Sequence, residues 1–247
     1  MKGKAQPVSL PPVIGNTDEQ KNASRIFTKE TTLSINTTEE GSIVYYTLDG
    51  TDPGISSTIY SAPISITRSC EVKAVSFVKG KVSSNVVTFN LRKAKYEINL
   101  LTEASARYSA SGPRTLVDGT YGSLKFTDGK WLGFEGDDFE AVIDLGAVKP
   151  ISEIVASFLQ SYNSWIFLPL SVELYISDDN KNYTPAGIVF GTVPLTYESD
   201  KFASFAIKTG KPARFVKIKA KNTGICPEWH KGKNGKAWLF VDEIEVK

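Results

Sequence analysis

The sequence predicts an all-β protein built from two antiparallel β-sandwiches, and three observations support this. Apolar and polar residues alternate with a period of two along many segments, which is the pattern of half-buried strands. Turn sequences such as Asp49-Gly50 and Thr209-Gly210 separate these segments. No long helical pattern interrupts them. Short strands at this spacing are typical of antiparallel sandwiches.

The expected strands follow one another from the N-terminal to the C-terminal part of the chain. The clearest case is "SVELYIS", in which Val172, Leu174 and Ile176 face one way and the polar residues between them face the other. The further expected strands are "TTLSI" (31–35), "SIVYYTL" (42–48), "EVKAVSFV" (71–78), "NVVTFNL" (85–91), "AVIDLG" (141–146), "FASFAIK" (202–208), "RFVKIKAK" (214–221) and "LFVDEIEVK" (239–247).

A domain boundary is expected where the strand "NVVTFNL" ends and the charged bridge "RKAK" (92–95) leads into a long irregular segment. The 247 residues suffice for two cores of ordinary size. We therefore expect a first domain over residues 10–92 and a second over 93–247. Residues 1–9 are expected to be disordered or foreign to the natural protein.

Charge and hydropathy restrict the class of protein. The chain carries 29 basic and 27 acidic side chains without long runs, so no electrostatic footprint for nucleic acid is present. No stretch approaches the roughly 18 apolar residues of a membrane-spanning helix, and we expect no membrane insertion. Cys70 and Cys226 fall in different expected domains, which argues against a disulfide framework.

The first domain carries a family signature. Residues 41–84 contain the turn Tyr-Thr-Leu-Asp-Gly-Thr-x-Pro in "YTLDGTDP" and, later, Ser-x-x-Tyr-x-x-Pro-Ile in "STIYSAPI". On these motifs the segment from about residue 11 to 91 resembles the immunoglobulin-like module at the C-terminal end of bacterial chitobiases and β-hexosaminidases. The resemblance implies an immunoglobulin-like sandwich.

The second domain resembles the coagulation factor 5/8 type C, or discoidin-like, fold, which overlaps the family 32 carbohydrate-binding modules. The segments that carry this resemblance are "LVDGTYGS", "WLGFEGDDFEAVIDLG", "PLSVELYISDDNKNY", "ARFVKIKAKN" and "WLFVDEIEVK". The resemblance implies a galactose-binding-like jelly roll over nearly all of residues 100–247.

The order of the two modules resembles the C-terminal end of family 20 glycoside hydrolases, the β-N-acetylhexosaminidases. It implies an exported protein, periplasmic or at the cell surface, with an upstream catalytic domain in the same polypeptide. Nothing in this sequence reads as the catalytic barrel of that family. We therefore expect a non-catalytic fragment that binds glycans containing N-acetylhexosamine or galactose weakly, and keeps the enzyme near its substrate. The alternative is a pair of structural domains that pack against the barrel and bind no sugar.

Sugar binding needs an apolar ring face beside planar polar groups, and two loops of the second domain offer both. The candidate residues are Tyr162, Asn163 and Trp165 in "LQSYNSWIFLP", Trp229 and His230 in "CPEWHKGKNG", and Arg107 in a polar loop. For the two exposed-loop tryptophans, packing within the loops is the alternative. Trp238 enters a strand and is expected in the core.

The discoidin-like resemblance also implies a structural calcium. Its ligands would come from an Asp-Gly loop, a hydroxyl residue a few positions later and a glutamate at the head of the last strand. The corresponding residues here are Asp118, Thr120, Ser123 and Glu243, with a carbonyl near Thr115. Hard oxygen ligands of this kind suit Ca²⁺. The alternative is an Asx turn at Asp118 with Glu243 in solvent.

Catalysis and zinc binding are disfavoured for the remaining candidates. Cys226 and the single histidine, His230, stand in one glycine-rich loop with no group in the sequence to orient the base. They also supply two ligands where a structural zinc site needs four. The acidic segments "GDDFE" and "SDDNKNY" are interpreted as turns.

Overall fold

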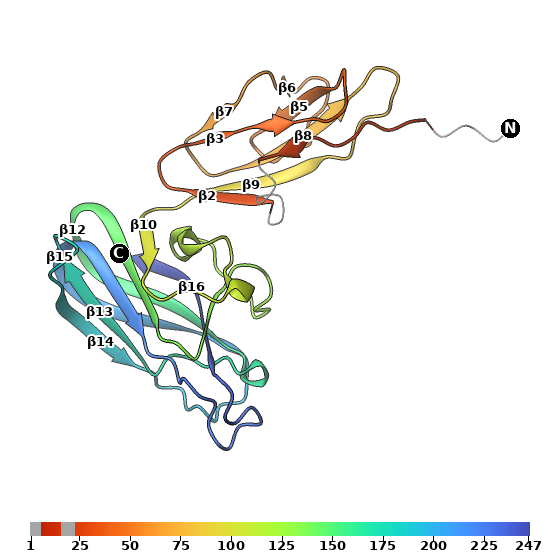
Figure 1. Cartoon of the computed structure of the whole chain (residues 1–247). Helices are drawn as coiled ribbons and strands as arrows, with labels where there is room; N and C mark the ends of the chain where they lie inside the picture. The colour runs from red at the N-terminus through yellow and green to blue at the C-terminus, as the bar shows by residue number, and fades with distance from the viewer. Residues whose placement is uncertain (1–5, 16–22) are drawn as a thin grey trace. The chain divides into compact units, whose positions relative to one another are not determined.

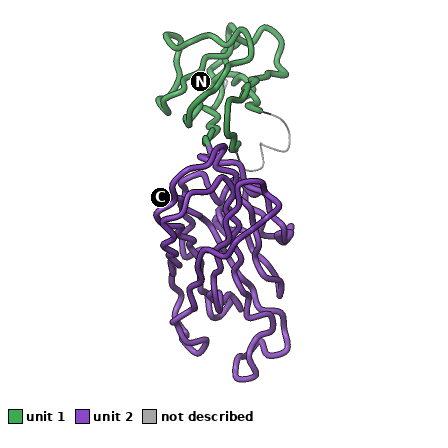
Figure 2. The backbone as a smooth tube through the Cα atoms, turned by 90° about the vertical axis from the view of Figure 1, so that its left-hand side faces the viewer, with its two compact units in different colours: residues 1–93 green, residues 94–247 purple. Residues whose placement is uncertain are grey.

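The computed structural model describes residues 6–15 and 23–247. The chain forms two compact units, residues 1–93 and 94–247, which Figure 2 shows in green and purple. The predicted all-β class is confirmed, because the described residues form strands and short 3₁₀ turns and contain no α-helix. No helix in the described ranges is long and apolar enough to cross a membrane.

The described residues of the first unit form nine strands, most of them short (Figure 1). They are β1 (Val13–Ile14), β2 (Ser24–Phe27), β3 (Thr31–Leu33), β4 (Ile35–Asn36), β5 (Ile43–Thr47), β6 (Thr58–Ile59), β7 (Ile64–Ile66), β8 (Cys70–Phe77) and β9 (Val87–Lys93). Five of them form one sheet in the order β2-β9-β8-β5-β6, while β1-β4 and β3-β7 form two-stranded sheets.

These sheets share one core. The five-stranded sheet contributes Val44, Val72 and Phe89, and the small sheets contribute Leu33 and Ile66, all buried in one cluster. Each of these residues occupies an apolar position of a period-two pattern, so one face of each of their five strands is removed from water. The first unit is therefore a β-sandwich.

The start of the first unit is more ordered than the sequence suggested. Residues 1–5 lie outside the described part of the chain, but Val8 forms a parallel bridge to Val82. Ser9 is buried, and its hydroxyl donates to the carbonyl of Val82 at 3.0 Å. Val8 and Ser9, which were expected in a disordered start, are thus held by backbone pairing with Val82.

The second unit contains seven strands and three 3₁₀ turns. The strands are β10 (Glu97–Leu100), β11 (Leu132–Glu135), β12 (Phe139–Gln160), β13 (Ser171–Ser177), β14 (Thr184–Phe190), β15 (Lys201–Ala220) and β16 (Trp238–Val246). The turns are η2 (Ala106–Tyr108), η3 (Pro113–Val117) and η4 (Tyr162–Ser164). All strand pairs of this unit are antiparallel.

Two long strands turn a corner together and link the layers of this sandwich. The pairing of β12 with β15 is irregular between Asp144 and Lys149 and resumes at Lys149↔Ala213. On one side of the corner, β12 pairs with β10 and β15 pairs with β13. On the other side, β12 pairs with β16. The expected turn at Thr209-Gly210 lies at a second irregularity of this pairing, between Ile151↔Lys211 and Glu153↔Lys208, where Gly210 adopts a φ of 63°, a conformation that favours glycine.

The core of the second unit is aromatic and aliphatic. Phe139, Ala141 and Ile143 alternate inward along β12 and are fully buried. Phe158 of β12 meets Phe205 of β15 edge to face, with ring centroids 5.4 Å apart. This rigid sandwich supports the loops that follow β12 and precede β16, in which the candidate sugar-binding residues lie.

Candidate functional site

The two loops that carry most of the candidate residues lie side by side in the second unit. One follows β12 (residues 161–170) and the other joins β15 to β16 (residues 221–237). The Trp238 N–H donates to the carbonyl of Trp165 at 2.8 Å, and the Phe167 N–H donates to the carbonyl of Trp238 at 3.0 Å. This backbone ladder brings Trp229 close to Tyr162, Asn163 and Trp165, from which it is far apart in the sequence.

We call the surface formed by Tyr162, Asn163, Trp165, Trp229 and Lys231 the aromatic surface. Trp229 and Tyr162 form its exposed aromatic part. The Trp229 and Tyr162 rings are nearly parallel, with an interplanar angle of 10° and centroids 6.2 Å apart. Trp229 is 48% exposed. The Lys231 ammonium donates to Asn163 Oδ1 at 2.5 Å, so a cation and an amide stand beside the rings.

His230 does not belong to the exposed surface, and this corrects the expectation that it would contact a ligand. The residue is 1% exposed. The Gly232 N–H donates to Nδ1 at 3.0 Å, so the proton of a neutral ring is on Nε2, which lies 3.1 Å from the carbonyl of Tyr162. The ring also meets Phe167 edge to face. His230 therefore fixes the position of the loop that presents Trp229.

Trp165 is partly packed and partly exposed. Its backbone is left-handed, with φ 64°, and the residue is 38% exposed. The indole lies against two glycines: a Cβ atom added at Gly232 would come within 2.5 Å of the ring, and one added at Gly235 within 2.9 Å. One part of the Trp165 ring thus packs on the loop while the rest faces solvent, and sugar contact at Trp165 stays a prediction.

Arg107 lies in η2 and is exposed. Its guanidinium stands 5.3 Å from the centroid of the Tyr108 ring. Tyr108 in turn meets Trp238 edge to face at 5.2 Å. The structure thus links Arg107 to the strand that follows the second loop, and no direct contact between Arg107 and the aromatic surface is seen among the described residues. Trp238 is half-buried in an aromatic cluster, as expected.

Asn222 anchors the second loop, and the sequence analysis missed it. Its side chain is buried, and Nδ2 donates to the carbonyls of Asp137 at 2.9 Å and Ala237 at 3.2 Å. Its Oδ1 accepts the N–H of Gly224 at 3.1 Å, which is an Asx turn. The pattern Asn-x-Gly in "KNTG" is the local signal for that turn, but the contacts with distant carbonyls leave no trace in the sequence.

The acidic loop after η3 meets the head of the last strand. Glu243 is buried, and its Oε2 accepts the N–H of Gly119 at 3.0 Å, while Asp118 Oδ1 accepts the N–H of Thr120 at 2.8 Å. The Asx turn at Asp118 is therefore present. Glu243, however, is not in solvent, which corrects the alternative interpretation of this residue. Burial, followed by the charge of Asp118, raises the pKa of Glu243 to about 8.

Two neighbours complete this acidic loop. Asp242 is buried, and its Oδ2 accepts the N–H of Gly122 at 2.7 Å; burial raises its pKa. Ser123, by contrast, has its carbonyl bonded to the Trp131 indole N–H at 3.0 Å and its hydroxyl to the N–H of Lys125 at 3.2 Å. The loop thus holds Asp118 and Glu243 close together, while the polar groups of Ser123 are engaged elsewhere. No group of three or more His, Cys, Asp or Glu side chains placed to hold a metal occurs in the described ranges.

Cys226 behaves as a small core residue. It is 3% exposed and packs with Phe167 and Ala237. Burial raises the pKa of its thiol, which keeps the thiol protonated near neutral pH and lowers its nucleophilicity. His230, four residues away, has both ring nitrogens engaged by backbone groups.

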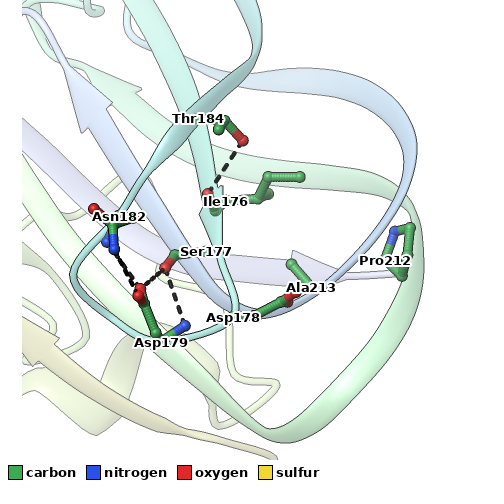
Figure 3. A pocket seen from close by; sticks show the side chains of 8 residues that line it. All are labelled: Ile176, Ser177, Asp178, Asp179, Asn182, Thr184, Pro212 and Ala213. Carbon is green, nitrogen blue, oxygen red and sulfur yellow. Dashed lines mark hydrogen bonds between the residues drawn. The ribbon is translucent and has the colours of Figure 1, made fainter.

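A hollow of about 360 Å³ lies at the turn between β13 and β14, next to Pro212 and Ala213 of β15 (Figure 3). Its polar groups are largely satisfied within the turn: Asp179 Oδ1 accepts the N–H groups of Lys181 and Asn182, and Ser177 donates to the same oxygen at 2.9 Å. These hydrogen bonds lower the pKa of Asp179 well below its usual range. The segment "SDDNKNY" is thus a turn, as predicted.

Comparison with known proteins agrees with the sequence motifs of the first unit. Residues 22–88 match the family model of the chitobiase/beta-hexosaminidase C-terminal domain. This part of the chain is thus similar to that family, and the predicted resemblance to a chitobiase C-terminal region is confirmed. No curated protein matches the chain.

Solved structures resemble about three fifths of the chain. CpGH89CBM32-6 from Clostridium perfringens is 19% identical and covers 63% of this chain and 94% of its own, with a TM-score of 0.36. CpGH89CBM32-4 from the same organism, solved in complex with GlcNAc-α-1,4-galactose, is 13% identical over 62% of this chain and 90% of its own, with a TM-score of 0.39. The C-terminal domain of a chitobiase from Bacteroides fragilis is 17% identical over 63% of this chain and 96% of its own, with a TM-score of 0.38.

Proposed function

We propose that this chain is a non-catalytic accessory region of an exported glycoside hydrolase, and that its second unit binds glycans weakly. The observation that carries the proposal is the aromatic surface. A half-exposed Trp229 lies parallel to Tyr162 on loops held by backbone hydrogen bonds, with the Asn163 amide and the Lys231 ammonium beside the rings. A sugar ring can place its C–H face on such an indole and direct its hydroxyls to the polar groups.

The first unit supports the accessory role. Its match to the chitobiase/beta-hexosaminidase C-terminal domain family connects the chain with enzymes that remove terminal N-acetylhexosamines. The proposed partners are accordingly glycans that contain N-acetylhexosamine or galactose, and a catalytic domain in the same polypeptide. Export to the periplasm or cell surface is part of the same proposal, since such glycans are found there.

Weak binding is expected from the geometry of the aromatic surface. The site is shallow, and one exposed indole with a few polar neighbours has little to offset the entropy of association. A module of this kind acts by raising the effective concentration of the attached enzyme at a polymeric substrate. Millimolar affinity for one sugar unit would be sufficient for that role when several units are available.

A structural calcium ion is proposed at the acidic loop. Asp118 and Glu243 are held close together, and burial, followed by the charge of Asp118, raises the pKa of Glu243. Their oxygens, with the carbonyls of Thr115 and Thr120, are donors of the hard type that Ca²⁺ prefers. The ion would fix the loop after η3 against the head of β16. Ser123 is omitted from this ligand set because its polar groups bond elsewhere.

The test of the proposed function is a titration of the full chain with N-acetylglucosamine, N-acetylgalactosamine, galactose and their oligomers, followed by calorimetry and NMR. We expect saturable binding that Trp229→Ala abolishes. The control is Trp229→Phe, which keeps an aromatic face and should retain part of the affinity. If none of these sugars produces heat or shifts at millimolar concentration, the proposal is wrong and a purely structural role replaces it.

A further inference from the structure

The first unit has a polar hollow of its own, at the end of β5 where the chain enters the turn "LDGT". The hollow has a volume of about 380 Å³, which is within the range of small-ligand sites. Three segments contribute to it: the end of β5 with its turn, the start of β6 and the link between β7 and β8. Its lining residues are Tyr46, Thr47, Leu48, Asp49, Ser56, Ser57, Thr58 and Arg68.

Arg68 is the cation of this hollow. It lies between β7 and β8, is exposed, and makes no ion pair or hydrogen bond with any residue of the described part of the chain. A guanidinium presents several N–H donors in a planar fork that matches a carboxylate with two parallel hydrogen bonds. The other two arginines of this unit, Arg25 and Arg92, are engaged, Arg25 with Thr31 at 2.8 Å. Arg68 is thus available to a ligand.

Asp49 lies on the same hollow but does not neutralise Arg68, since no ion pair joins them among the described residues. Its Oδ1 accepts the N–H of Thr51 at 3.1 Å and the hydroxyl of the same residue at 2.6 Å. These hydrogen bonds lower the pKa of Asp49, so it remains an acceptor at neutral pH. A ligand that fills the hollow therefore meets a cation on one side and a carboxylate acceptor on another.

The hydroxyl groups of the lining divide into engaged and available ones. Thr47 donates to the carbonyl of Thr51 at 2.5 Å, and Ser57 accepts the N–H of Gly54 at 3.0 Å. The side-chain hydroxyls of Ser56 and Thr58 have no hydrogen-bond partner within the described ranges. The hollow at the β13–β14 turn differs in this respect, because its polar groups are largely used by the turn itself (Figure 3).

We propose that this hollow of the first unit binds a carboxylate-bearing sugar, such as a hexuronic acid residue. Arg68 holds the carboxylate in a bidentate manner, Asp49 accepts sugar hydroxyls, and the hydroxyls of Ser56 and Thr58 complete the polar contacts. A simple anion would satisfy Arg68 but would be repelled by Asp49. A neutral sugar would satisfy Asp49 and leave the guanidinium without a partner. A hexuronic acid carries a carboxylate and several hydroxyl donors on one small ring, so it satisfies Arg68, Asp49 and the hydroxyls of Ser56 and Thr58 together.

This site is independent of the aromatic surface of the second unit. It lies in the domain that matches the chitobiase/beta-hexosaminidase C-terminal family, and none of its residues belongs to the loops around Trp229. The chain would then recognise two kinds of sugar, one acidic and one neutral, with separate units.

The test is an NMR titration of the full chain with sodium glucuronate, in which backbone amides of residues 46–49 and 56–58 report on the hollow. We expect saturable shifts with glucuronate and at least about tenfold weaker binding of glucose and of sodium acetate, because each of these lacks one half of the contacts. Arg68→Gln should weaken glucuronate binding about tenfold or more, and Arg68→Lys should weaken it less.

The matched control is Lys79→Gln, which removes one positive charge from the same unit. Lys79 lies two residues after Phe77, which pairs with Ile43. Ile43 is at the opposite end of β5 from Thr47, so the variant leaves the hollow intact. It should bind glucuronate like the unchanged protein. The proposal is wrong if glucuronate produces no saturable shifts, or if acetate produces equal shifts. It is also wrong if Lys79→Gln and Arg68→Gln lose equal affinity for glucuronate. Trp229→Ala should leave glucuronate binding unchanged. Failure of glucuronate binding can therefore be distinguished from failure of neutral-glycan binding at the aromatic surface.

Discussion

The most informative single perturbation is Glu243→Gln at the acidic loop. The pKa of Glu243 is raised from 4.5 to about 8 in the folded chain, mainly because the carboxyl is buried and Asp118 lies nearby. The folded state therefore binds the proton more tightly than the unfolded state. Below pH 4.5 both states are protonated and the group has no effect. As pH rises from 4.5 to 8, the free energy of unfolding falls by about 1.4 kcal/mol per pH unit.

The size of this effect follows from the two pKa values. The full penalty above pH 8 is about 5 kcal/mol, and at pH 7 it is about 3 kcal/mol, which corresponds to about 9 °C in the melting temperature of a unit of this size. A bound calcium ion would stabilise the ionised carboxylate and remove this loss. Glu243→Gln keeps the shape of the side chain and eliminates the titration.

The assay is thermal unfolding between pH 5 and pH 8, with calcium and with a chelator. In the presence of chelator we expect the melting temperature to fall with pH for the unchanged protein, and to fall less for Glu243→Gln. Calcium should raise the melting temperature of the unchanged protein at pH 7 and have little effect on the variant. Glu135→Gln, an exposed change on β11, is the control and should behave like the unchanged protein. The reasoning fails if calcium and chelator leave the melting temperature the same, or if Glu243→Gln has the same pH slope.

Two further changes test the loops that present Trp229. Gly232→Ala would place a Cβ 2.5 Å from the Trp165 ring, so we expect a loss of about 1 to 3 kcal/mol in stability. Glycan binding should also weaken, although the change removes no group that contacts the glycan. The control is Gly54→Ala, which has open space around it and should change neither stability nor binding. Asn222→Ala removes donors to buried carbonyls and should cost about 2 to 4 kcal/mol in chemical unfolding. A loss below 1 kcal/mol would show that water replaces the amide.

Much of the fold can be predicted from the sequence, because period-two alternation and turn residues are local signals. The strands around Val172 and Ile218 appear where that pattern indicates them. The sequence does not show that "FASFAIK" and "RFVKIKAK" form one strand, β15, that continues through an irregularity at Gly210. A glycine with positive φ is compatible with a hairpin turn and with an irregularity inside a strand, and only the long-range pairing with β12 distinguishes the two.

The candidate site was predicted in part. The aromatic residues of two distant loops were expected as candidates, and backbone pairing between Trp165 and Trp238 places these loops together. The burial of His230 and Glu243 was missed because a polar residue in a loop or at a strand head carries no sign of what covers it. In both cases the cover is contributed by residues distant in the sequence, Phe167 for His230 and Gly119 for Glu243.

The central claim is that the second unit binds glycans on the aromatic surface formed by Trp229 and Tyr162. The most direct measurement is a calorimetric titration of the full chain and of Trp229→Ala with oligomers of N-acetylglucosamine and with galactose-containing glycans. We predict saturable millimolar binding by the unchanged chain and none by the variant, while both keep the same melting temperature because Trp229 is half-exposed. Equal binding by both proteins, or no binding by either, would contradict the account.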